Sequence, residues 1–124
     1  MLASRFLRLA IIYALSGVAL GIFMAASHDI SQMPTHAHIN LLGFVSTAIY
    51  GFFYRLYPAA EEGWMAQAHF WIANLGFIVL MGFVAAFHAG IAAAEMGAAA
   101  MSVVVLIGLV LFAVIVFKST ARTA

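Results

Sequence analysis

The sequence contains no cysteine, and this absence narrows the chemistry that the chain can perform. Without cysteine there is no disulfide framework, no thiolate metal site, no cysteine nucleophile and no covalent attachment of a c-type heme. Histidine, carboxylate and methionine side chains remain as the candidate ligands for a metal or a cofactor.

Charged residues are also scarce: they make up 7% of the 124 residues, whereas 67% of the residues are hydrophobic. Soluble domains carry about 25% charged and about 45–50% apolar residues, so this composition indicates a membrane protein whose main partner is the lipid bilayer. The net charge is only +1, from 5 basic and 4 acidic residues. We therefore expect no nucleic-acid partner, because such binding requires a strongly basic surface.

Long apolar runs predict the fold. The chain is short enough for one domain only, and each run approaches or exceeds the roughly 20 residues that cross a hydrocarbon core about 30 Å thick. We predict a single transmembrane domain over residues 1–124, an all-α integral membrane four-helix bundle with antiparallel neighbours. The predicted helices cover residues 9–27, 36–57, 64–87 and 98–117.

The basic residues predict the orientation of this bundle. They are Arg5, Arg8, Arg55, Lys118 and Arg122, at the N-terminus, in the second loop and at the C-terminus. The positive-inside rule then places both termini in the cytoplasm and the first and third loops outside. We expect a multi-pass protein of a bacterial-type inner membrane. Residues 9–27 are expected to remain as a helix, because this run is longer than the apolar part of a signal peptide.

Small and aromatic residues predict helix contacts and membrane depth. Gly17 and Gly21 form one line of small residues, and a second line runs from residue 43 to residue 51, so both allow close approach of neighbouring helices. The tyrosines at positions 50 and 54 lie near the predicted cytoplasmic end of the second helix. They are expected in the interfacial belt, where amphipathic rings are favoured.

Histidines and carboxylates gather on the predicted outer side, where no basic residue is expected. The set comprises His28, Asp29, His36, His38, His88 and Glu95. Imidazole and carboxylate together bind copper and zinc, and ionisable groups at a membrane span mark functional sites. The alternative for each histidine taken singly is contact with headgroups and water at a helix end.

His69 stands apart from the other histidines. It lies 19 residues before His88 in the same predicted helix, which is about 28 Å at the helical rise. The two residues therefore cannot share a site within one chain. Glu61 and Glu62 are near in sequence and are interpreted as a solvated loop pair, and His69 is interpreted as an interfacial or supporting residue.

His36 and His38 are two positions apart, which is a rotation of about 200° on an α-helix. Their rings therefore point to nearly opposite sides, and one ion cannot easily take both. This geometry indicates either two cofactors or an oligomer in which a neighbouring protomer supplies a ligand. We expect a homo-oligomer, a dimer or a trimer.

A family resemblance rests on these two histidines. Residues 35–45 (THAHINLLGFV) and 50–58 (YGFFYRLYP) resemble the His-x-His helix of the catalytic subunit of heme-copper oxidases and nitric-oxide reductases. Residues 68–76 (AHFWIANLG) are similar to the opening of the following helix. The resemblance implies that His36 matches the ligand of the high-spin heme and His38 the ligand of the low-spin heme.

The resemblance covers only residues 35–87, and the family subunit has many more helices than this chain. The helix with the copper histidines, the distal low-spin ligand and the arginines that hold heme propionates have no counterpart. The chain alone therefore lacks a complete oxygen-reducing centre, and whether it is an enzyme, which would then be an oxidoreductase, stays open. His88 or His28 is a candidate for a second axial ligand, although no family motif assigns it.

Three hypotheses follow from the sequence. The leading one is a heme b protein with His36, His38 and His88 as candidate ligands, acting in electron transfer with a respiratory redox partner or in binding oxygen or nitric oxide. The second is a copper or zinc site built from the outer histidines and carboxylates. The third is a cofactor-free accessory or assembly subunit of a respiratory complex.

Overall fold

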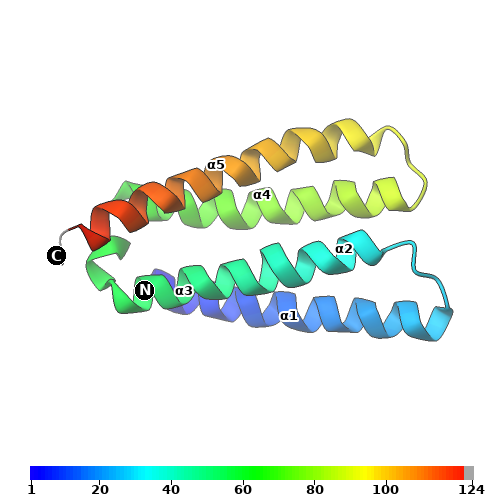
Figure 1. Cartoon of the computed structure of the whole chain (residues 1–124), viewed down its shortest axis with the longest axis horizontal. Helices are drawn as coiled ribbons and strands as arrows, with labels where there is room; N and C mark the ends of the chain where they lie inside the picture. The colour runs from blue at the N-terminus through cyan, green and yellow to red at the C-terminus, as the bar shows by residue number, and fades with distance from the viewer. Residues whose placement is uncertain (122–124) are drawn as a thin grey trace.

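The computed structural model, which describes residues 1–121, is all-helical (Figure 1). Within these residues, 4 helical segments are long and apolar enough to span a membrane. Consecutive segments run antiparallel, so the start of the first span and the end of the last span lie at the same end of the bundle (Figure 1). The segments are α1 (Leu2–Ser27), a three-part second span (Met33–Leu56), α4 (Trp64–His88) and α5 (Ala94–Thr120).

The structure contains the four spans that the sequence predicts. Three of the four begin earlier along the chain than predicted. The first helix begins at Leu2 rather than at residue 9, because the Glu61 carboxylate accepts the backbone N–H groups of Leu2 and Ala3 at 2.9 and 2.8 Å. The last helix begins at Ala94 rather than at residue 98, and the acidic Glu95 in its first turn suits the positive end of the helix dipole.

The second span is continuous but wound in three ways. It consists of α2 (Met33–His38), the π-helix η1 (Ile39–Ser46) and α3 (Thr47–Leu56). The π winding pairs groups five residues apart, and the Ser46 hydroxyl donates to the Leu41 carbonyl over the same interval at 3.0 Å. The sequence predicted one uniform helix here, because hydropathy does not distinguish π from α winding.

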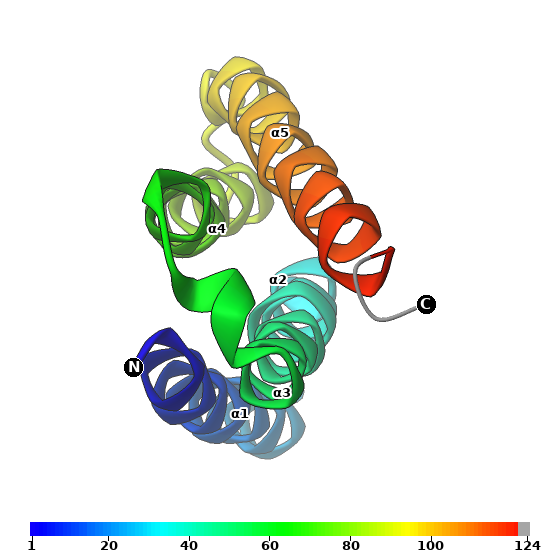
Figure 2. The ribbon, with the colours of Figure 1, turned by 90° about the vertical axis from the view of Figure 1, so that its left-hand side faces the viewer.

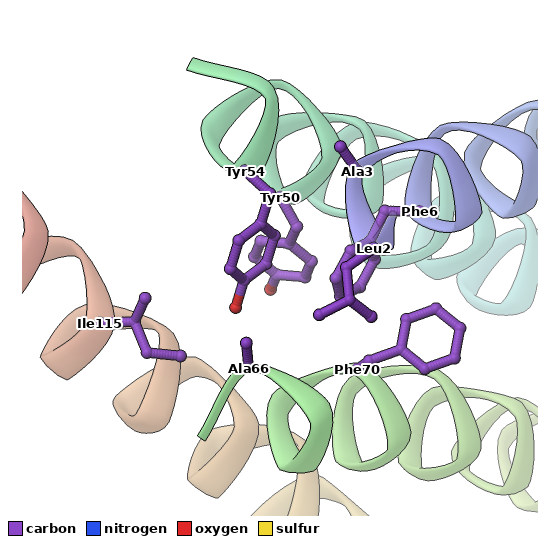
Figure 3. Close-up of a cluster of buried hydrophobic side chains, with 8 residues drawn as sticks. All are labelled: Leu2, Ala3, Phe6, Tyr50, Tyr54, Ala66, Phe70 and Ile115. Atoms are coloured by element: carbon purple, nitrogen blue, oxygen red, sulfur yellow. The ribbon is translucent and has the colours of Figure 1, made fainter. Parts of the chain in front are cut away.

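The buried interior divides into two clusters. The larger one joins all four spans near the chain termini and is drawn in Figure 3, where Tyr50 and Tyr54 project from α3 toward α4. It comprises Leu2, Ala3, Phe6, Tyr50, Tyr54, Ala66, Phe70 and Ile115. The second comprises Tyr13, Phe77, Leu80, Met81 and Val84. Tyr50 and Tyr54 are therefore core residues whose rings pack inside the bundle, and their depth at a membrane interface stays a prediction.

Close contact between α1 and the second span depends on Gly17 and Gly21. A Cβ at Gly17 would lie 2.5 Å from Asn40 Oδ1, and one at Gly21 would lie 2.8 Å from His36 Cε1. The predicted close approach along this small-residue line is confirmed, and it occurs between two helices of the same chain. This close contact sets the position of His36.

Candidate functional site

Four histidines lie at the end of the bundle formed by the first and third loops, which we call the histidine end. His28 ends α1 in the left-handed conformation (φ 55°), His36 and His38 lie in α2, and His88 ends α4. In Figure 1 this is the end opposite the labelled termini. We call the end with the termini and the second loop the loop end.

His36 faces α1 and is half-buried. Its Nδ1 lies 2.8 Å from the Gly17 carbonyl oxygen, and because a carbonyl only accepts, Nδ1 carries the proton and donates. The Asn40 amide nitrogen lies 3.4 Å from Nε2, and the ring rests against the backbone of Gly21. Protein atoms therefore surround this imidazole on the side of α1.

His38 is exposed on the outer surface of the same short helix. Its Nδ1 donates to the carbonyl of Pro34, one turn earlier, at 2.7 Å. His36 contacts α1 while His38 is exposed, so the predicted divergence of the two rings agrees with the structure. Because Nδ1 carries the proton of this hydrogen bond, Nε2 of His38 is the ring nitrogen that can offer a lone pair to a ligand.

His88 repeats this arrangement at the end of α4. Its Nδ1 donates to the Val84 carbonyl at 2.9 Å, and the ring is half-buried. The Gln32 amide donates to the Ala85 carbonyl at 3.1 Å, so the start of the second span is tied to the last turn of α4. In metal sites, a histidine ligand usually donates its second ring N–H to a carbonyl or carboxylate, which fixes the tautomer and the ring orientation.

The remaining candidates at the histidine end lie in exposed positions. His28 and Asp29 are in the first loop, where the Asp29 carboxylate accepts the Ser31 N–H at 2.9 Å. This hydrogen bond holds the pKa of Asp29 below its ordinary value. Glu95 is exposed in the first turn of α5.

No group of three ligand side chains converges among residues 1–121. The six residues predicted to form a metal site therefore share one end of the bundle but are not assembled into a three-ligand centre within the described part of one chain. The assignment of individual histidines as ligands stays a prediction.

His69 lies at the loop end and is fully buried, at 0% exposure, so its interpretation as an interfacial residue is wrong. The Phe112 ring stacks on it with centroids 5.0 Å apart, and the Tyr50 ring meets it nearly at right angles at 4.6 Å. Tyr54, also at 0% exposure, hydrogen-bonds His69 Nδ1 at 2.9 Å. Nε2 of His69 has no hydrogen-bond partner among the described residues.

The inward face of the second span is polar or small along its whole length, which sequence reasoning missed. Its residues are His36, Asn40, Gly43, Thr47, Tyr50 and Tyr54, and all of them are buried or half-buried. Their spacing alternates between four and three residues, so the pattern could have been recognised as one helix face. Across the bundle, the Tyr13 hydroxyl donates to Asn74 Oδ1 at 3.1 Å. The interior therefore carries polar groups from end to end.

Comparison of the chain with known protein families, with curated proteins and with solved structures finds no match in any of the three. The site is accordingly interpreted from its own geometry.

Proposed function

We propose that this chain is a heme-binding membrane protein in which His38 supplies an axial ligand at the histidine end. The observation that carries the proposal is the hydrogen bond from Nδ1 of the exposed His38 to the Pro34 carbonyl, which leaves Nε2 as the ring nitrogen for a ligand. A histidine that binds iron through Nε2 needs its proton on Nδ1, and the exposed position leaves room for a porphyrin. His88 has the same tautomer and is the candidate second ligand.

His36 fits an axial ligand less well than His38 does. Its ring packs against Gly21, and the Asn40 amide lies 3.4 Å from Nε2, so an iron atom at that nitrogen would have to displace neighbouring groups. We therefore assign His36 a positioning role: it ties α2 to the Gly17 carbonyl and so sets the orientation of the next turn, which carries His38.

Ligand number is the reason for placing heme ahead of a bare ion. Heme iron needs one or two protein ligands, whereas copper or zinc usually takes three or four. The described residues provide single histidines with a free Nε2 rather than a group of three ligands. A copper or zinc site would need ligands from a second copy of the chain.

When bound, heme supplies one-electron chemistry, and with a single histidine ligand it also offers a position for oxygen or nitric oxide. The chain's part is to hold the imidazole, fix its tautomer and surround the porphyrin with apolar side chains. Exposed Leu41, one turn after His38, belongs to such a surface. In this proposal a second copy, in a dimer or a trimer, covers the other face of the heme.

The proposed orientation places the histidine end outside a bacterial-type inner membrane and both termini in the cytoplasm. Arg5, Arg55 and Lys118 lie at the loop end, whereas Asp29 and Glu95 lie at the histidine end. This charge distribution satisfies the positive-inside rule. A respiratory redox partner would then exchange electrons with the heme from the outer side.

The test is an absorption spectrum of the detergent-purified protein, oxidised and then reduced with dithionite, with iron, copper and zinc analysis of the same sample. We expect a Soret band and sharp reduced bands, and we expect His38→Ala to lose them. His28→Asn is the matched control, because it removes an exposed histidine of the same end and Asn tolerates the left-handed backbone there.

Other outcomes distinguish the alternatives. We expect His36→Ala to keep a weakened spectrum, whereas retention in both His36→Ala and His38→Ala would contradict the proposal. A colourless sample with stoichiometric copper or zinc would favour the ion site. A colourless, metal-free protein that co-purifies with a larger complex would favour the accessory subunit.

A further inference from the structure

A cavity of about 460 Å³ lies at the loop end, remote from the histidine end. Its walls come from the end of α3, the 3₁₀-helix η2 (Pro58–Glu61) with the loop after it, the start of α4 and the last turns of α5. Figure 2 looks onto this end and shows η2 crossing between α3 and α4, near the end of α5. The volume lies within the roughly 300–1,000 Å³ of small-molecule sites.

The walls of this cavity are held by contacts that exist without a guest. The Tyr57 ring stacks on Phe53 with centroids 4.9 Å apart and an interplanar angle of 24°. The Glu61 carboxylate binds the first two backbone N–H groups of α1 and so anchors η2. Ile115 lines the cavity and is also part of the buried core. A preformed site avoids much of the ordering cost of binding.

Two opposite charges line the same cavity. Lys118 lies on the α5 side and Glu62 on the loop side. The Lys118 ammonium donates to the Met65 sulfur at 3.9 Å, which is a weak bond because a thioether is a poor acceptor. An ammonium has three donors, so Lys118 keeps N–H groups for a guest. The Glu62 carboxylate is exposed and is an acceptor.

The geometry points to a binding site for phosphatidylethanolamine, with the lipid phosphate at Lys118, its ammonium at Glu62 and its glycerol and first acyl carbons against Met65, Tyr57 and Ile115. This lipid carries one anion and one hydrogen-bonding cation, matching the two charges. Phosphatidylglycerol would place its anion without a cation for Glu62. The trimethylammonium of phosphatidylcholine has no N–H to donate.

The depth of the cavity in the membrane supports this occupant. Trp64 at the start of α4 is exposed, and Tyr57 lies at the other end of the second loop, directly after α3. The amphipathic rings of tryptophan and tyrosine favour the headgroup level of the bilayer. Both ends of the second loop therefore suit the level of a lipid headgroup, and the exposed Leu56 on α3 offers an apolar surface to the acyl chains.

The experiment is native mass spectrometry of the delipidated protein with equal concentrations of phosphatidylethanolamine, phosphatidylglycerol and phosphatidylcholine of matched acyl chains. We expect about tenfold stronger retention of phosphatidylethanolamine, since charge-assisted hydrogen bonds at both ends distinguish it. We expect Glu62→Gln to abolish the preference over phosphatidylglycerol and Lys118→Met to weaken binding of both lipids.

Control variants separate this site from a general charge effect. Glu95→Gln removes an exposed carboxylate at the opposite end, and Arg55→Gln removes an exposed base at the same end that does not line the cavity. Both should retain the wild-type preference. Equal retention of the three lipids by the wild type would overturn the inference, and so would a preference that survives Glu62→Gln. The result does not depend on whether heme is bound at the histidine end.

Discussion

The two ends of the bundle use histidine in opposite ways. At the histidine end, His38 is exposed and its Nδ1 is occupied by a backbone carbonyl, so the ring offers Nε2 to the outside. At the loop end, His69 is enclosed by aromatic rings, and its Nδ1 is hydrogen-bonded to a tyrosine of the second span. The first arrangement suits ligand binding, and the second suits the cohesion of the bundle.

The surroundings of a histidine therefore decide its role within this bundle. A buried polar group that lacks a hydrogen-bond partner lowers the free energy of unfolding by about 1–3 kcal/mol. Nε2 of His69 is such a group among the described residues, so packing around the ring must offset its cost. The exposed histidines at the other end carry no such cost. Stability should therefore depend on the loop end, and cofactor binding on the histidine end.

The largest expected effect comes from the core of the loop end. Phe6 is fully buried and stacks on Tyr54 with centroids 5.6 Å apart. Phe6→Ala should lower the free energy of unfolding by about 3–5 kcal/mol, because it leaves a cavity between α1 and α3. A reversible SDS titration followed by circular dichroism measures this. The exposed Phe52→Ala is the matched control, with an expected change within about 0.5 kcal/mol.

The hydrogen bond between Tyr54 and His69 tests whether the loop end carries the stability of the bundle. Tyr54→Phe should destabilise by about 1–3 kcal/mol, because it removes the hydrogen-bond partner of His69 Nδ1 and leaves both ring nitrogens unpaired. Tyr54→Phe combined with His69→Phe should lose less than the sum of the single changes, since the unpaired nitrogens are then gone. The same titration of the four proteins completes the cycle.

Two results would break that expectation. Strict additivity in the cycle would show that the hydroxyl and the imidazole are not coupled. A loss from His38→Phe as large as that from Tyr54→Phe would show that the histidine end also carries stability.

The contact between Gly21 and His36 tests the histidine end itself. Gly21→Ala would place a Cβ 2.8 Å from His36 Cε1, so the ring must move. We expect a loss of about 1–3 kcal/mol from overpacking, together with a shifted heme spectrum if His36 positions the next turn. Gly82→Ala is the control, because a Cβ there meets no atom within 4 Å. An unchanged stability and spectrum in Gly21→Ala would remove His36 from the site.

The smallest expected effect concerns the start of α1. Glu61→Ala removes the acceptor of the Leu2 and Ala3 N–H groups and should destabilise by about 0.5–2 kcal/mol, the usual range for a lost helix cap. The neighbouring Glu62→Ala should leave the thermal midpoint in detergent unchanged. Equal shifts for the two variants would indicate a general charge effect rather than a cap.

Much of the fold could be predicted because hydropathy is a local property. Runs of apolar residues long enough to cross a bilayer have few other structural outcomes in lipid, since every backbone group must be satisfied within the segment. The divergence of His36 and His38 also followed from helical rotation alone. The assignment of Glu61 to a solvated loop was wrong, because its partners, Leu2 and Ala3, lie far away along the chain.

The candidate site was less predictable, because its geometry depends on contacts between residues that are far apart in the sequence. The sequence places four histidines near helix ends, but it does not show that His36 packs on Gly21 while His38 stays exposed. Nor does it show that His69 meets Tyr54, 15 residues earlier and on another span. These contacts depend on which faces of two helices meet, and π winding in η1 alters the facing of the residues after it.

The amino-acid sequence alone therefore determined four helical spans long and apolar enough to cross a membrane, their order and the gathering of histidines at one end, because composition, length and helical rise suffice for these. The packing of four spans determined which histidine is buried, which carbonyl each of His36, His38 and His88 faces and where the cavity at the loop end forms. Those features arise from contacts between residues that are distant along the chain, and burial and hydrogen bonding exist only once the helices are in place.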